Sequence, residues 1–201
     1  MSVLDFKRDK RISAVHREKL REFCQTLGGD PVKLANELGL KVFERDLAED
    51  EDGYIGFDPS LGSPTGFVIF LNRAKSPERK RFTVAHEVGH FVLHRNEPEF
   101  VDNLKKWKPI VRSHGIGNIV SFPLGKRSLA QKSATETILG TVKLGRRLEN
   151  EAHQFAANLL LPRYLVRKTP EFNAGQPAAL ARRLGLSIRF VAIRFEEVYF
   201  D

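Results

Sequence analysis

Two histidines and a glutamate stand close together in the run His86-Glu87-Val88-Gly89-His90. Residues four apart share one face of a helix, so both imidazoles can reach a single ion. Zinc suits such ligands, and a catalytic zinc site needs a third protein ligand and one position for water. The metal lowers the pKa of that water, and Glu87 stands where it can accept the proton and pass it to a leaving amine. The pattern predicts His86 and His90 as metal ligands and Glu87 as the catalytic base, with Zn²⁺ as the ion and Mn²⁺ or another divalent ion as alternatives.

The element that must position these residues is a helix predicted to begin at Ser76-Pro77-Glu78 and to run to about His94. A serine cap, a proline in the first helical position and an acidic residue in the first turn are typical of a helix start. Apolar residues occur on most sides of this helix, so we expect it to be central and buried. Buried histidine and glutamate are costly unless paired or metal-bound, which favours a metal site over ordinary core histidines.

The third ligand has to come from another element. His94 lies one turn beyond His90, too close along the same helix to complete a tetrahedron, and we expect it to support or pack beside the ligands. A later helix, predicted from about 147 to 161, carries Glu149 and Glu151 at opposite edges of its apolar stripe. Periodicity does not choose between these two glutamates, and either would make a site of two histidines and one glutamate.

The remaining elements predict an α+β fold. Further helices are expected at 12–27, 31–38, 177–184 and 187–198, and strands at Leu40–Glu44, Tyr54–Asp58 and Phe67–Asn72. Strands this close in sequence predict a small antiparallel meander. The last strand is apolar without alternation, so we expect it to be covered on both faces. Prolines, glycines and a Ser/Thr-rich patch in 95–146 predict loops and short strands.

Length and composition indicate a single domain over residues 1–201. A hydrophobic fraction of 41% in 201 residues is enough for one substantial core. We expect three parts: residues 12–94 with the N-terminal helices, sheet and active-site helix, residues 95–146 as an insert or lid, and residues 147–201 with the ligand-bearing helix and a helical tail.

Charge and cysteine content bound the partners and the compartment. The net charge of +8 fits either an acidic partner or a basic protein with scattered charges. The single cysteine, Cys24, excludes an internal disulfide and a cysteine-based zinc site. Residues 1–11 lack an apolar signal core and no window holds eighteen apolar residues, so we expect a cytoplasmic protein with no membrane association.

Two segments, residues 79–94 and 151–162, resemble the ImmA/IrrE family of metallopeptidases. The similarity extends over about residues 20–94 and 147–200. It implies a thermolysin-like zincin core, in which a small, mostly antiparallel sheet packs on the His-Glu-x-x-His helix and a second, glutamate-bearing helix, with a helical C-terminal tail. It also implies Glu151 as the third metal ligand. The chain departs from the family at His153, where asparagine is common, and in the longer spacing between His90 and Glu151.

These features predict a zinc-dependent endopeptidase that cleaves a protein substrate, and the resemblance implies a helix-turn-helix transcriptional repressor as that substrate. Candidate donors to the developing oxyanion are Arg112, His114, His153 and Tyr164. The strand Gly66–Leu71 is a candidate for pairing with an extended substrate. One alternative function is DNA binding through residues 178–198, in which Gly185, Ser187 and Arg194 resemble a helix-turn-helix. The other is an antitoxin-like partner with a structural metal, which would have no need of Glu87.

Overall fold

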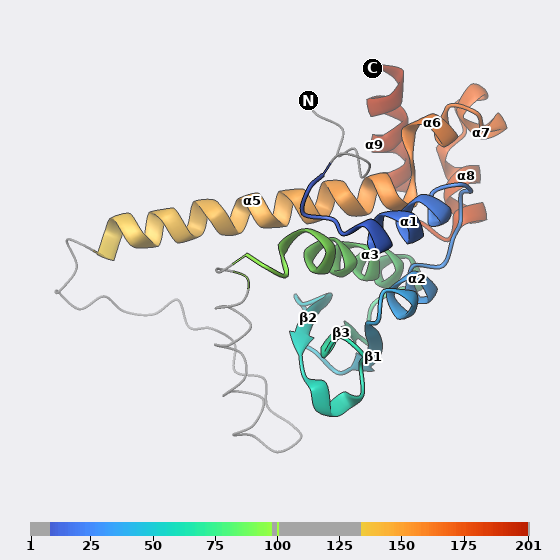
Figure 1. Cartoon of the computed structure of the whole chain (residues 1–201). Coiled ribbons are helices and arrows are strands. Elements are labelled where there is room, and N and C mark those ends of the chain that lie inside the picture. Colours follow the sequence, from blue (N-terminus) through green and yellow to red (C-terminus); the bar gives the residue numbers. More distant parts are fainter. Residues whose placement is uncertain (1–8, 98–99, 101–133, 201) are drawn as a thin grey trace.

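The helix that carries the two histidines, α3 (Pro77–His94), lies between the sheet and a long helix in the computed structural model, which describes residues 9–97, 100 and 134–200 (Figure 1). The Ser76 hydroxyl accepts a hydrogen bond of 3.3 Å from the Arg79 amide, as the cap pattern predicts. Val84, Ala85 and Val88 have no exposed surface. The predicted start and the predicted central position of this helix are both confirmed.

The sheet has three strands, β1 (Lys41–Arg45), β2 (Gly53–Phe57) and β3 (Phe67–Asn72), in the order β1-β3-β2. β1 runs parallel to β3 and β2 antiparallel to it. The predicted antiparallel meander is therefore wrong, and the sheet is mixed. The reason is that β3, the most apolar strand, takes the centre, where both of its faces are buried as the sequence indicates.

The central position of β3 also removes one predicted role. Its backbone has a hydrogen-bonded neighbour on each side, so it has no edge left for an extended substrate. Between β2 and β3 lies the short 3₁₀ helix η1 (Pro59–Leu61).

The long helix α5 (Ala134–Leu160) runs along α3 (Figure 1). Its buried line of Leu148, Ala152, Phe155, Ala156 and Leu159 confirms the predicted apolar stripe. The helix begins at Ala134 rather than near residue 147, and the predicted loops over 134–146 are wrong. Gly140 and Gly145 suggested breakers, but a helix tolerates glycine at a cost of about 1 kcal/mol each. Most of the predicted insert or lid, residues 95–146, lies outside the described residues.

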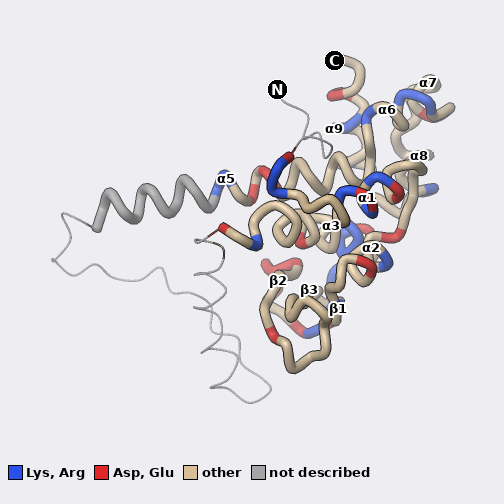
Figure 2. Tube along the Cα trace, in the orientation of Figure 1, with Lys and Arg blue, Asp and Glu red and all other residues tan. Residues whose placement is uncertain are grey.

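Six further helices belong to the described part of the chain. They are α1 (Ala14–Phe23), α2 (Pro31–Glu37), α6 (Arg163–Val166), α7 (Pro170–Asn173), α8 (Pro177–Leu184) and α9 (Ile188–Tyr199). The sequence predicts all but the two four-residue helices α6 and α7. Among the described residues no helix combines the length and the apolar character needed to cross a bilayer. Figure 2 shows basic and acidic positions interspersed along the described chain, with both kinds on α1, α3 and α9.

Helices α3 and α5 meet backbone to backbone at Gly89. A Cβ atom placed there would lie 3.2 Å from both Cα and O of Ala152 and 3.0 Å from Cδ1 of Phe155. Glycine is thus required by the close approach, and this contact sets how far α5 is rotated relative to the histidines.

We expect Gly89→Val to lower the free energy of unfolding by roughly 1–3 kcal/mol, because the added side chain forces the two helices apart. Urea unfolding followed by circular dichroism measures the change. Glu22→Val, at an exposed position of α1, is the matched control and should cost much less. Equal stabilities for the two variants would contradict the close packing.

Candidate metal centre

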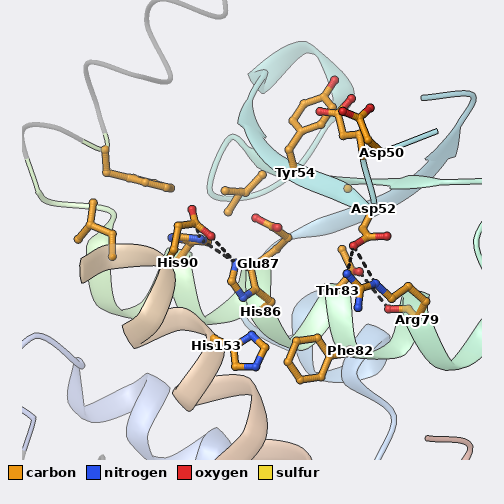
Figure 3. A pocket seen from close by; sticks show the side chains of 16 residues that line it. Asp50, Asp52, Tyr54, Arg79, Phe82, Thr83, His86, Glu87, His90 and His153 are labelled. Carbon is orange, nitrogen blue, oxygen red and sulfur yellow. Dashed lines mark hydrogen bonds and ion pairs between the residues drawn. The ribbon is translucent and has the colours of Figure 1, made fainter. Parts of the chain in front are cut away.

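His86, His90 and Glu149 bring three donor atoms together at the α3–α5 interface. His86 Nε2 lies 3.1 Å from His90 Nε2 and 3.1 Å from Glu149 Oε2. His90 Nε2 lies 3.3 Å from Glu149 Oε1. Ligands of a tetrahedral metal with bonds of 2.0–2.1 Å are about 3.3 Å apart. Each imidazole meets a different oxygen of Glu149, and one donor atom from each of the three residues lies within 4.8 Å of the other two. The group can therefore hold a single divalent ion, and Figure 3 shows the two imidazoles side by side at the cavity wall.

The charge of this group also suits a cation. The neighbouring imidazoles of His86 and His90 hold the pKa of the Glu149 carboxyl far below its ordinary value, so the group is anionic. A carboxylate and two imidazoles form the ligand set of many catalytic zinc sites, and other divalent ions accept the same donors.

The carboxylate beside the histidines belongs to Glu149, whereas the family resemblance indicated Glu151. Glu151 points instead to His94, whose Nε2 lies 3.0 Å from its Oε2. Residues two apart on a helix point roughly 200° apart, so only one of the two glutamates can face the imidazole pair. The contact between Gly89 and Ala152 decides which, because residue 149 lies one turn before residue 152 on the same face.

Glu87 lies beside this group on the sheet side of α3. Its carboxylate is 6% exposed overall and hydrogen-bonds to the backbone of Ile55 in β2. Burial raises the pKa of Glu87 to about 8, a rise that the neighbouring His86 opposes. Figure 3 shows the side chain directed into the same cavity as the histidines.

That cavity has a volume of about 560 Å³ and lies between α3, α5, β2 and the segment just before β2. Its walls combine acidic and aromatic side chains, namely Asp50, Glu51, Asp52, Tyr54, Phe82 and Phe100. The Phe100 ring stacks on His90 with 5.7 Å between centroids and 10° between planes. Asp52 is paired with Arg79, through a 2.7 Å bond from Nε and a second one from Nη2. β2 is an edge strand among the described strands, so the cavity opens beside a strand that has one free edge.

The candidate oxyanion donors lie in different places relative to the cavity. His153 lines the cavity beside Phe82, with ring centroids 4.9 Å apart, and burial lowers its pKa. The Tyr164 hydroxyl instead donates to the carbonyl of Cys24, away from the histidines. Arg112 and His114 lie outside the described residues.

The helix pair that resembles a helix-turn-helix is present as α8 and α9, but one of its basic residues, Arg194, is buried. Gly185 is the left-handed cap of α8, and the Ser187 side chain caps α9. Arg194 is only 3% exposed and bonds to Asn158 at 3.0 Å and Glu197 at 2.8 Å. Its guanidinium therefore holds α9 against α5 and does not face a partner.

Comparison with known proteins links the chain to metalloproteases. Residues 35–108 match the peptidase family model described as the IrrE N-terminal-like domain. This range includes the sheet, α3 and both histidines, but ends before Glu149. The chain is also 46% identical over 39 residues to the radiation response metalloprotease IrrE of Deinococcus radiodurans. That match covers 19% of this chain and only 12% of the relative.

We expect Zn²⁺ at about 100 times its dissociation constant to raise the unfolding temperature by roughly 5–10 °C, because a ligand of the folded state stabilises it by about 2.7 kcal/mol at that ratio. Differential scanning calorimetry of the metal-free protein measures the shift. Glu149→Ala should lose most of it, and Glu196→Ala, at an exposed position of α9, should keep it. A full shift in Glu149→Ala would exclude this carboxylate as a ligand.

Proposed function

Because the chain belongs to the ImmA/IrrE family through residues 35–108, we propose that it is a zinc-dependent endopeptidase in which His86, His90 and Glu149 hold the metal. The observation that carries the proposal is the cluster of donor atoms from these three residues, within 4.8 Å of one another, beside a buried glutamate in the same cavity. The packing of α3 between a small sheet and α5 is consistent with a small zincin fold.

In this proposal Glu87 moves the proton. When bound, zinc supplies a water of lowered pKa and polarises the carbonyl of the scissile peptide. Glu87 would accept the proton of the attacking water while the water oxygen bonds to the carbonyl carbon. Glu87 then donates the proton to the amine nitrogen as the carbon–nitrogen bond breaks. The hydrogen bond from the Ile55 backbone holds the carboxylate in the cavity for both transfers.

We propose that the substrate binds as an extended strand along β2. This strand lines the cavity and has a free edge among the described strands, whereas β3 is paired on both sides. Backbone pairing to an edge strand tolerates many side chains, and the pockets that alternate side chains enter provide selectivity. Asp50 and Glu51 line the same cavity, and their charge favours a basic residue in the bound segment.

The identity of the substrate rests on the sequence resemblance alone, which implies a helix-turn-helix repressor. The radiation response metalloprotease IrrE is matched over only 12% of its length, too little to transfer a substrate. DNA binding has less support, because basic and acidic positions are interspersed along the described chain (Figure 2) and Arg194 is buried.

We expect Glu87→Gln to reduce peptide cleavage by about 10²–10⁴-fold, because the amide cannot accept the proton. The substrate for this test is a library of peptides from a digested bacterial proteome, incubated with the zinc-loaded full chain and read by mass spectrometry. Zinc content should stay near that of the wild type, and Glu196→Gln should cleave normally.

Two results would reject the proposal. One is undiminished cleavage by Glu87→Gln. The other is the absence of cleavage by a wild-type protein that has bound one equivalent of zinc.

A further inference from the structure

We propose that His94 and Glu151 are positioning residues that set the tautomer of the metal ligand His90, and that Arg11 and Arg147 hold Glu151 in place for this task. The inference rests on the proposed metal site. In it Glu151 acts on the ligand His90 through His94 and does not touch the ion. It follows from a continuous chain of side chains that runs from the donor atoms through the core to the N-terminal segment.

The chain of contacts leaves His90 on the side opposite the metal-facing nitrogen. His90 Nδ1 lies 3.1 Å from His94 Nδ1, and His94 Nε2 lies 3.0 Å from Glu151 Oε2. His94 has no exposed surface, so water does not compete for either of its nitrogens. Both ring nitrogens of His94 are therefore committed to side-chain partners.

The direction of each hydrogen bond follows from the charge at the far end. An ionised carboxylate only accepts, so His94 Nε2 carries the proton and donates it to Glu151. A neutral imidazole has one N–H, and complete burial disfavours a second proton, so His94 Nδ1 accepts. His90 Nδ1 must then donate. The lone pair of His90 is left on Nε2, the atom that faces His86 and Glu149.

Two arginines keep the carboxylate at the end of this chain ionised and oriented. Arg11 Nη1 donates to Oε2 of Glu151, and Arg147 Nη1 donates to Oε1 at 3.1 Å. Arg11 is itself held by Asp9, whose Oδ2 lies 2.7 Å from Nη2. The N-terminal segment is thus tied electrostatically to the ligand helix.

A histidine ligand binds a metal through a lone pair, and the partner of its other nitrogen decides whether that lone pair is on the right atom. Without Glu151, either nitrogen of His94 can carry the proton. His94 can then donate from Nδ1 to His90, which places a proton on His90 Nε2 and blocks the metal-facing atom. Loss of Glu151 should therefore weaken metal binding even though its side chain does not touch the ion.

The first experiment measures zinc affinity of the full chain by competition with a chromophoric chelator. We expect Glu151→Gln to raise the dissociation constant about 10–100-fold, the usual effect of removing a hydrogen-bond partner of a ligand. Arg11→Met should give a smaller increase, because Arg147 still contacts Glu151. The control is Glu97→Gln, which removes a carboxylate 3.6 Å from the same Arg147. The bond of Glu97 to His94 runs from its backbone amide to the His94 carbonyl, and the substitution leaves it in place. The affinity of this control should stay within about twofold of the wild type, well below the effect of a lost partner.

The second experiment reads the tautomers directly in metal-free protein labelled with ¹⁵N-histidine. Long-range ¹H–¹⁵N spectra should show His90 protonated on Nδ1 and His94 on Nε2 in the wild type. Glu151→Gln should lose this fixed pattern while its unfolding temperature remains near that of Glu97→Gln. A merely structural role for Glu151 would change the stability and leave the tautomers as they are.

The outcomes separate this inference from the proposed function. Wild-type zinc affinity in Glu151→Gln, or His94 protonated on Nδ1 in the wild type, overturns the positioning role while the metal site stands. Complete loss of zinc in Glu151→Ala with retention in Glu149→Ala also overturns it, because Glu151 would then be the ligand. A wild-type protein that binds no zinc rejects the proposed function itself, and the tautomer measurement still tests the hydrogen-bond chain.

Discussion

The site depends on the contact of two helices at one residue. At Gly89 the backbone of α3 lies so close to Ala152 and Phe155 of α5 that a Cβ atom there would be in tight contact with both residues. Because a helix is rigid, this contact sets the rotation of every residue on the adjoining turns of α5. It places Glu149 beside His86 and His90, and Glu151 beside His94.

The two glutamates of α5, Glu149 and Glu151, contact different histidines of α3. Glu149 meets His86 and His90, and Glu151 meets His94. The three histidines follow one another along α3 at intervals of one turn. His86, Glu87, His90 and His94 lie on a helix that is packed among apolar side chains. Burying such polar groups costs free energy unless each has a partner. The carboxylates of α5 and the backbone of β2 provide those partners.

The charged groups around the site act at different distances. Glu149 meets the imidazoles directly, whereas Arg11 and Arg147 reach them only through Glu151 and His94. Asp52 is balanced by Arg79 at the other end of the cavity. The net charge of +8 therefore says little about the site, where Asp52 and Glu151 each have an arginine partner.

The sequence by itself determined the helix of His86, Glu87 and His90, because a cap, a proline and a four-residue spacing are local features. Its burial, the apolar stripe of α5 and the α+β class follow from periodicity in the same way. Only the tertiary structure decided the sheet order, since β3 takes the centre through contacts with strands at different separations along the chain. It also placed Glu149, and not Glu151, beside the imidazole pair. Both flank one apolar stripe in the sequence, and the rotation of α5 depends on Gly89, which lies on another helix.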